Sequence, residues 1–531
     1  MSKMNNPVTI LFFFTLLFLV TTIVPVTTMP ISMETDPIMS SSTSPMLGSS
    51  IVPTSVSTVP QISTTSIENS TFKSRPIPSD PLIIGYAHDA TSGKVEEAIR
   101  NGVNVICWSF VDMVVSSEGE GTKGVARPMI RTNLNTEAIN KIRNQEGMEH
   151  VLHIAAIGGW NSPHPPSSSS SSSTTTTTTS FSQFAKGIVS DNKEFASLGE
   201  QWCDIFIKFN KQYNNIFDGF DWDLEGQDNV DGAGNSYFTK ETLDIMVDMS
   251  KVAKLKYGLI VSMAPAESYL DAIAGNDDNE NDQSNNSPRL FSYQLNLPPR
   301  SYQHNPTDVA FIKSNNFSHA GRQCYAYVLH NAGIDTFDWI SLQLYEGYSS
   351  FLHETTRQGV FSKDAIVRRA ELLNEGYLVK GMPIGSERVR RKLRKAVDDN
   401  NIKDAADNGN VSNNDDETET VMIKVPLSKL VIGVANGWAD NIKFSQINPQ
   451  SLEDSYMELN QRFGESYRGA MFWTIDEEGS GGMYMASSLT SVFRRCRTMT
   501  INDDRNDEVV DDKNDRSSSR KRTIPASGKE L

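Results

Sequence analysis

Eight short apolar runs recur along the middle of the chain, and polar segments with helical patterning separate most of them. The runs are residues 82–87, 103–110, 151–157, 216–224, 258–264, 339–344, 430–435 and 469–475. The helix-like segments include residues 91–100, 195–213, 240–256, 364–376 and 451–463. Strands that alternate with helices indicate parallel pairing, and eight such units predict a (β/α)8 TIM barrel of the α/β class. The active-site face of such a barrel is formed by the carboxyl ends of its strands.

The chain outside this region divides by composition. Residues 1–28 contain an uncharged apolar run shorter than the roughly 20 residues of a spanning helix, which predicts a secretory signal peptide, with an uncleaved signal-anchor as the alternative. Residues 29–79, rich in Ser, Thr and Pro, predict a flexible linker. Residues 80–497 hold the predicted barrel, and the charged residues 498–531 predict a disordered tail. We therefore expect a secreted protein, and several Asn-x-Ser/Thr triplets are consistent with glycosylation.

Two low-complexity blocks interrupt the barrel region. One is the Ser/Thr run at 167–179, and the other is the Asn/Asp-rich block at 398–419. Neither composition supplies enough apolar surface to form a packed element. Both are therefore expected to be long surface loops inserted into the barrel.

The net charge of the chain is −16, from 49 Lys and Arg against 65 Asp and Glu. Nucleic acids and anionic membrane surfaces need clustered cations, so neither is expected as a partner beyond a possible signal-anchor in the membrane. The 4 cysteines are too few and too widely spaced for a disulfide-stapled fold, and Cys107 lies in an apolar run that favours a buried free thiol. We expect a monomer.

The fourth predicted strand contains acidic and apolar residues in alternation. The acids are Asp221, Asp223 and Glu225, and the apolar residues are Phe220, Trp222 and Leu224. Successive side chains of a strand point to opposite faces, so the apolar set, including Trp222, should face the helices, and the acids should line the barrel interior in steps of about 6.6 Å. Like charges in a confined site raise the pKa of at least one acid, and Glu225, at the mouth, is best placed to donate a proton. A solvated acidic strand or a divalent-ion site is the alternative.

These acids, together with Asp218, match the D-x-x-D-x-D-x-E signature of glycoside hydrolase family 18, the chitinases and their relatives. Further segments resemble that family in the same order along the chain, over residues 82–476. They are Ala156-Ile-Gly158-Gly159-Trp160, similar to the S-x-G-G turn, Ser262-Met263-Ala264-Pro265, similar to the M-A-P segment, Gln343-Leu-Tyr345, similar to Q-x-Y, and Met471-Phe-Trp473, similar to the strand that carries the family's floor tryptophan.

The resemblance implies a retaining mechanism in which the substrate supplies its own nucleophile. Glu225 would protonate the glycosidic oxygen, and the 2-acetamido carbonyl of the substrate would attack the anomeric carbon. Water would then open the oxazolinium intermediate, with Glu225 acting as the base. Asp223 would orient the acetamide N–H, Asp221 would share a proton with Asp223, and Tyr345 would hydrogen-bond the acetamide. Trp473 would form an apolar floor beneath the sugar ring.

The resemblance also suggests the rest of the substrate site. The residues expected to bind substrate besides Trp473 are Gln343, Met263, Trp160, Gly158 and Gly159. Asp218 would be a structural member of the signature. No metal and no cofactor are implied, and the expected substrates are chitin or chito-oligosaccharides. The short segment between the seventh and eighth predicted strands leaves no room for the α+β insertion of some relatives, which favours an open cleft and endo-type cleavage.

Three positions depart from the family pattern. Ala156 replaces a serine, Ala266 follows M-A-P where glutamate is common, and Glu346 stands where many relatives have Asn or Asp. His88, after the first predicted strand, should lie near the barrel mouth, but the sequence assigns it no role. Two other functions stay open: an endo-β-N-acetylglucosaminidase of the same family that acts on N-glycan cores, and a chitin-binding lectin without activity. Such lectins usually replace the glutamate donor, which this chain keeps as Glu225.

Overall fold

The computed structural model describes nine stretches of the chain. They are residues 74–116, 127–160, 162–165, 197–225, 238–273, 288–293, 323–347, 349–385 and 418–499. The chain divides into two units, Met1–Glu68 and Asn69–Leu531, and every described residue belongs to the second. The predicted signal segment and the Ser/Thr run lie outside the described residues, as do nearly all of the linker, the acidic block and the tail. No helix in the described part is long and apolar enough to cross a membrane.

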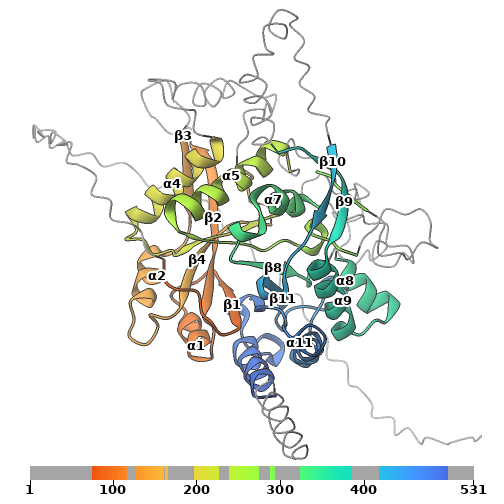
Figure 1. The fold of residues 1–531 in the computed structure, drawn as a ribbon. Coiled ribbons are helices and arrows are strands. Elements are labelled where there is room, and N and C mark those ends of the chain that lie inside the picture. The colour runs from red at the N-terminus through yellow and green to blue at the C-terminus, as the bar shows by residue number, and fades with distance from the viewer. Residues whose placement is uncertain are drawn as a thin grey trace, which may run out of the picture. The chain divides into compact units, whose positions relative to one another are not determined.

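Eight parallel strands close into a barrel (Figure 1). They are β1 (Leu82–Ala87), β2 (Val105–Ser116), β4 (Leu152–Gly159), β5 (Gly219–Leu224), β6 (Ile260–Met263), β8 (Trp339–Gln343), β11 (Leu430–Ala435) and β12 (Gly469–Trp473). Each pairs with the next along the chain, and β12 closes the sheet by pairing with β1, with Ile84 opposite Met471. The predicted (β/α)8 barrel is confirmed, and all eight strands overlap the eight predicted apolar runs.

The helices follow the strands in the order that the patterning predicts. They are α1 (Lys94–Arg100), α2 (Thr136–Arg143), α4 (Leu198–Gln212), α5 (Lys240–Tyr257), α7 (Cys324–Ala332), α8 (Ser350–His353), α9 (Ser362–Glu375) and α11 (Pro449–Phe463), and residues 485–499 are also helical. Local chemistry sets their ends. The Thr239 side chain accepts the Thr242 N–H at the start of α5, and Gly258, with φ of 64°, ends this helix in the left-handed conformation.

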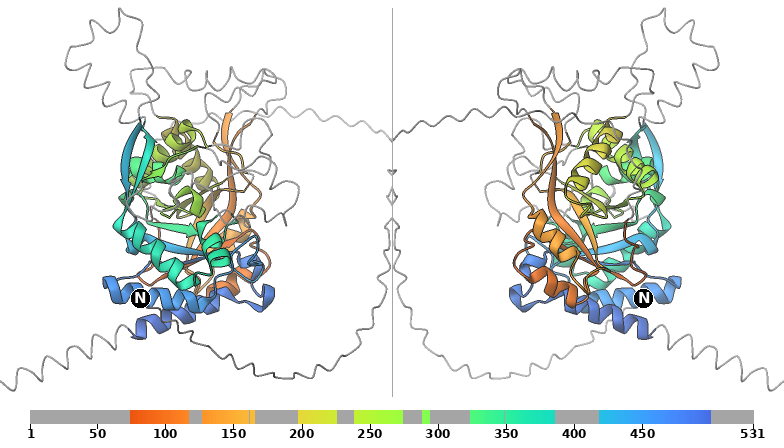
Figure 2. Two further views of the ribbon diagram at one scale, coloured as in Figure 1. Left: turned by 90° about the vertical axis from the view of Figure 1, so that its right-hand side faces the viewer. Right: turned by 90° about the vertical axis from the view of Figure 1, so that its left-hand side faces the viewer.

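Four further strands lie outside the barrel. Strand β3 (Arg127–Thr132) pairs antiparallel with β2. A separate sheet has the order β10 (Thr418–Ile423), β9 (Tyr377–Pro383) and β7 (Arg289–Leu290), and both β9 and β10 contact α7 (Figure 2). Residues 436–468, all of them described, contain α11 and no strand. The segment between β11 and β12 therefore carries no small α+β domain, in agreement with the sequence.

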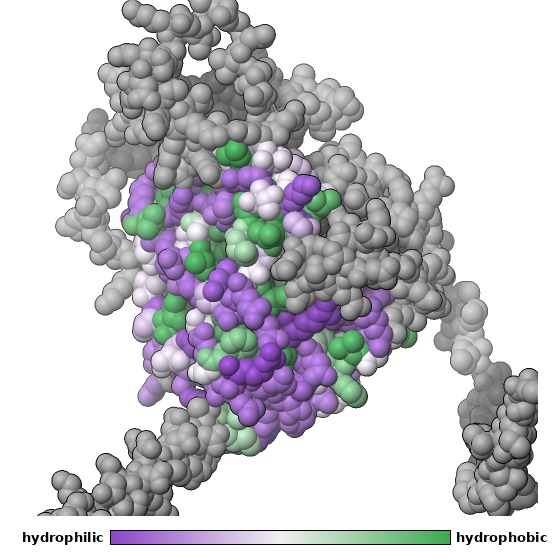
Figure 3. All heavy atoms as spheres, turned by 45° about the vertical axis from the view of Figure 1, so that its right-hand side comes forward, coloured by the Kyte–Doolittle hydropathy of each residue, from purple (hydrophilic) through white to green (hydrophobic). Residues whose placement is uncertain are grey.

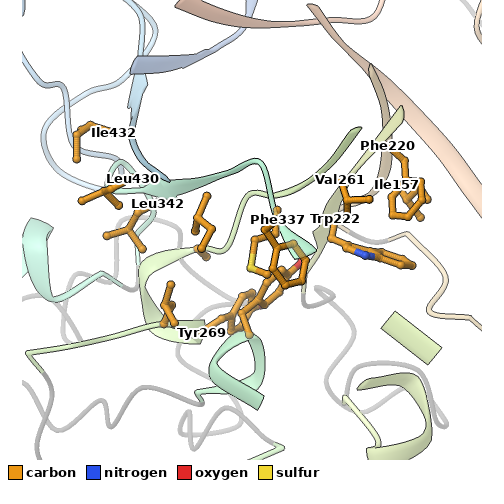
Figure 4. Packing of buried hydrophobic residues seen from close by; sticks show 14 of the residues in the cluster. Ile157, Phe220, Trp222, Val261, Tyr269, Phe337, Leu342, Leu430 and Ile432 are labelled. Carbon is orange, nitrogen blue, oxygen red and sulfur yellow. The ribbon is translucent and has the colours of Figure 1, made fainter. Parts of the chain in front are cut away.

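Alternate side chains of the barrel strands enter two different cores. The outer core lies between strands and helices and includes Ile157, Phe220, Trp222, Val261 and Leu342 (Figure 4). The inner core fills the barrel interior, here called the lumen, and includes Ile84, Cys107, Ile154, Trp339 and Met471. Trp222 faces the helices as predicted, because its Nε1 donates to Ser250 Oγ of α5 at 2.8 Å. Cys107 is a buried free thiol, as expected.

The described surface is mostly polar. On the face shown in Figure 3, apolar residues are dispersed among polar ones. Two of the most exposed large apolar side chains, Leu255 in α5 and Phe361 before α9, lie on different elements. Single exposed apolar residues are normal on soluble proteins, so they do not indicate a binding surface.

Candidate active site

Strand β5 carries the three predicted acids into the lumen. Asp221 and Asp223 are each 1% exposed, and Glu225, directly after the strand, is 8% exposed. Asp221 accepts a hydrogen bond from β1, and Asp223 accepts one from β8. Neither of those strands is a neighbour of β5 in the sheet, so both carboxylates must point across the lumen. The predicted inward orientation is confirmed for Asp221 and Asp223.

Two hydroxyl groups hold the innermost carboxylate. Tyr86 Oη donates to Asp221 Oδ2 at 2.5 Å, and Ser262 Oγ donates to Asp221 Oδ1 at 2.5 Å. Burial raises the pKa of Asp221 to about 6, although both hydrogen bonds oppose the shift. Asp221 lies in register with Ala156 of β4 on one side and with Ser262 of β6 on the other. Ser262 therefore supplies a hydroxyl to Asp221 where Ala156 supplies none.

The sequence left both of these contacts unassigned. Ser262 belongs to a quoted motif, and Tyr86 lies in the first predicted strand, yet neither is recognisable as a partner of Asp221 before the barrel closes. The available signal was strand alternation, which places Ser262 on the face opposite to Met263.

Asp223 is held from the far side of the lumen. Gln343 Nε2 donates to Asp223 Oδ1 at 2.7 Å and to the Ala264 carbonyl at 2.6 Å. Burial, followed by the nearby charges of Glu225 and Asp221, raises the pKa of Asp223 well above its usual value. Among the described contacts no hydrogen bond joins Asp221 to Asp223, so the sharing of a proton between them stays a prediction.

The backbone at the end of β5 is fixed by two rings. Tyr325 Oη donates to the Leu224 carbonyl at 3.0 Å, and Nε2 of the His164 ring lies 2.8 Å from the Glu225 carbonyl oxygen. Because that oxygen can only accept, the His164 nitrogen must donate. These contacts fix the backbone around Glu225, which directly follows the carboxyl end of β5.

Tyr345 and Trp473 lie beside the acids. Burial raises the pKa of Tyr345 well above its usual value, and the charges of Glu346 and Asp223 add to the shift. In the described part of the chain the Tyr345 hydroxyl has no hydrogen-bond partner, which leaves it available to a ligand. Trp473 is half-buried, and its ring centroid lies 5.4 Å from that of Tyr86, whose hydroxyl binds Asp221.

The two glycines at the end of β4 allow close contacts with neighbouring residues. Gly158 has φ of 125°, and a Cβ there would lie 2.4 Å from the Asp223 carbonyl oxygen. Gly159 has φ of 89°, and a Cβ there would lie 2.4 Å from the Phe110 ring. Both positions therefore require glycine for sterics and for conformation. Trp160 follows them at the end of β4 and is half-buried.

The expectation that Met263 binds substrate does not agree with its position. Its side chain is 0% exposed and belongs to the outer core, on the helix side of β6. The pleat of the strand turns its neighbours Ser262 and Ala264 into the lumen instead, where they contact Asp221 and Gln343.

Asp218 lies at the opposite end of β5 from the mouth. Its carboxylate accepts hydrogen bonds from Arg143 Nη1 at 2.6 Å and Nη2 at 2.7 Å, from the His153 N–H at 2.9 Å and from the Arg75 N–H at 3.2 Å. Burial acts to raise the pKa of Asp218, but these donors and the Arg143 charge outweigh burial and hold the pKa below its usual value. The fourth acid of the signature thus ties β5 to α2 and to the start of β4.

Within the described ranges, no group of three or more His, Cys, Asp or Glu is arranged to hold a metal ion. The described side chains at the mouth include carboxyl, phenol, amide and indole groups. A carboxyl group beside two buried acids can move a proton, and an indole face can pack on the C–H groups of a sugar ring.

Comparisons with known proteins return solved structures only: no family model and no curated protein matches the sequence. A family 18 chitinase from Pseudoalteromonas aurantia is 14% identical with a TM-score of 0.37, covering 77% of this chain and 99% of that one. A fungal endo-β-N-acetylglucosaminidase from glycosyl hydrolase family 18 is 12% identical with a TM-score of 0.39, covering 78% and 99%. Ostrinia furnacalis Group IV chitinase is 11% identical with a TM-score of 0.36, covering 78% and 100%. Similarity at this level does not show which activity this protein has. Its function must therefore be inferred from the residues of the site.

Proposed function

We propose that this protein is a retaining, chitinase-like glycoside hydrolase that cleaves β-1,4-linked N-acetylglucosamine polymers, with endo-type cleavage favoured. The observation that carries the proposal is the stack of acids on β5. Glu225 lies at the mouth of the lumen, above two buried carboxylates that are held by hydrogen bonds from other strands. This is the arrangement that the D-x-x-D-x-D-x-E signature implies.

Each group at the mouth suits one part of the reaction. Glu225 donates a proton to the glycosidic oxygen as the bond to the anomeric carbon breaks, and the acetamido carbonyl oxygen of the substrate forms the new bond to that carbon. Asp223 accepts the acetamide N–H, and the Tyr345 hydroxyl donates to the acetamide oxygen. Water then opens the oxazolinium ring after losing a proton to Glu225. Trp473 supports the sugar through its partly exposed ring.

The buried acids limit the negative charge beside the proton donor. The pKa of Asp221 is about 6, and burial raises that of Asp223 well above its usual value. The pair therefore retains a proton near neutrality more readily than two exposed aspartates would. A partly protonated pair still offers one carboxylate to the cationic intermediate.

The proposal is tested with the glutamate donor. Wild type should cleave chitohexaose and release the β-anomer first, as seen by proton NMR within minutes of mixing. Glu225→Gln should lower kcat by about 100- to 10,000-fold, the usual contribution of a general acid, while oligosaccharide binding persists. Glu371→Gln is the matched control, because it makes the same change in α9, where Glu371 pairs with Arg462 on the surface.

Each other outcome would indicate a different proton donor or a different function. Turnover that survives in Glu225→Gln would show that another group is the proton donor. A high-mannose glycopeptide offered in parallel and cleaved in preference to chitohexaose would indicate an endo-β-N-acetylglucosaminidase. Binding of chitohexaose by wild type without cleavage of either substrate would indicate a lectin.

A further inference from the structure

His88 lies at the mouth of the barrel, directly after β1, where its backbone is held by hydrogen bonds. Its backbone N–H donates to Asp476 Oδ2 at 2.8 Å, and the N–H of Asp89 donates to Asp476 Oδ1 at 3.2 Å. Asp476 belongs to the short 3-10 helix η6 (Ile475–Glu477) that follows β12. One carboxylate therefore ties the loop after β1 to the loop after β12, where the barrel closes.

A hydrogen bond to a backbone carbonyl also orients the side chain of His88. Its Nδ1 lies 3.1 Å from the carbonyl oxygen of Ser109, a residue of β2. Because a carbonyl can only accept, Nδ1 must carry a hydrogen, and Nε2 becomes the outward hydrogen-bonding atom. His88 is exposed, and across the described residues its Nε2 has no hydrogen-bond partner.

The ring of His88 stands at the edge of the proposed sugar floor. Its centroid lies 5.1 Å from that of Trp473 with an interplanar angle of 82°, and 5.9 Å from that of Phe110 with an angle of 67°. A sugar that packs its C–H face on an indole directs its hydroxyl groups outward from the rim of its own ring. An imidazole set edge-on beside that indole and held by the Ser109 carbonyl is positioned to meet one of those hydroxyls.

We propose that His88 is a further substrate-binding residue, whose Nε2 hydrogen-bonds a hydroxyl group of the sugar that stacks on Trp473. The proposal rests on the proposed function, because it requires a pyranose ring on that indole. His88 takes no part in proton transfer to the leaving group, which belongs to Glu225. Its contribution is to affinity and to the choice of sugar at this position.

Two substitutions separate the hydrogen bond from packing. In His88→Asn the amide can still donate to Ser109 but does not reach the position of Nε2, whereas the longer amide of His88→Gln does. We expect KM for chitohexaose to rise about 3- to 10-fold in His88→Asn, as for the loss of one neutral hydrogen bond, with kcat within about 2-fold of wild type. His88→Gln should recover part of this loss. Urea midpoints equal to that of wild type would show that both variants fold.

A second measurement does not depend on turnover. Binding of chitohexaose and of its mono-deoxy analogues is followed by tryptophan fluorescence in Glu225→Gln and in the double variant that also carries His88→Asn. One deoxy analogue should bind more weakly than chitohexaose to Glu225→Gln. The double variant should bind that analogue and chitohexaose with equal affinity. Equal binding of chitohexaose by both proteins would overturn the role of His88 while leaving the proposed function intact. A wild type that neither cleaves nor binds chitohexaose would instead refute the proposed function.

Discussion

Replacement of Asp218 by Asn should destabilise the protein without impairing its chemistry. Asp218 shares the acidic signature with the residues of the lumen, but its carboxylate meets Arg143, Arg75 and His153 at the amino end of β5. The catalytic residues of TIM barrels lie at the carboxyl ends of the strands, whereas residues at the amino ends contribute to stability. We therefore expect Asp218 to contribute to stability, and the other three acids of the signature to contribute to the chemistry.

The size of the effect follows from burial. The Asp218 carboxylate is fully buried and the Arg143 side chain is 12% exposed, so the substitution leaves a nearly buried guanidinium without its counter-charge. Breaking such a pair from one side costs about 3–5 kcal/mol. The slight exposure of Arg143 favours the lower end of that range.

Urea unfolding at pH 7, followed by tryptophan fluorescence, measures this loss directly. Asp112→Asn is the matched control, because Asp112 pairs with Arg131 at a similar distance of 2.8 Å but the Arg131 side chain is 57% exposed. An exposed pair contributes less than about 1 kcal/mol, so this variant should unfold almost as wild type does. The kcat of folded Asp218→Asn should stay within roughly 2-fold of wild type, since its site lies away from the mouth.

The pH dependence provides an independent check. The folded pKa of Asp218 lies below that of the unfolded chain, so its stabilising contribution is complete above the unfolded value of about 3.9 and is lost as the pH falls through the folded pKa. The difference between wild type and Asp218→Asn should therefore be constant near neutrality and shrink below about pH 4. Unchanged stability together with a kcat lowered well beyond about 2-fold would refute this reasoning and place Asp218 in the chemistry.

Two further predictions concern the pH–rate profile of kcat/KM. Tyr86→Phe removes a hydrogen bond that lowers the pKa of Asp221, so the limb governed by this group should move upward from about pH 6 by roughly 1 unit, and an unmoved limb would contradict the role of Tyr86. Burial raises the pKa of Glu346 to about 7, and its charge raises the pKa of Asp223. Glu346→Gln should therefore match wild type below about pH 7 and differ from it only above that value, whereas a difference confined to acid pH would exclude coupling to Asp223.

The success of the strand assignment depended on how deeply each strand is buried. All six residues of β1 and of β11 are buried, so these strands appear in the sequence as continuous apolar runs. By contrast, only two of the six residues of β10 are buried, and β9 is interrupted by the exposed Lys380. These strands, on the edge of the molecule, have no continuous apolar run and went unrecognised.

In the site, too, some features follow from a single strand and others do not. Alternation along β5 predicted that Asp221, Asp223 and Glu225 share a face, because side-chain direction in a strand is a property of the local backbone. The motif match that suggested Met263 as a substrate-binding residue carries no information about which alternate side chain faces inward. The direction of each side chain in β6 follows instead from its alternation along the strand and from the pairing of β6 with β5.

The sequence by itself determined the fold class, the order of the barrel strands and the face on which the acids of β5 lie. Only the tertiary structure decided which groups meet those acids: Tyr86 comes from 135 positions away and Gln343 from 120. It also decided that Asp218 is paired with Arg143, and that His88 stands beside Trp473. The physical reason is that alternation arises from one strand, whereas contacts across a lumen depend on the register and closure of all eight.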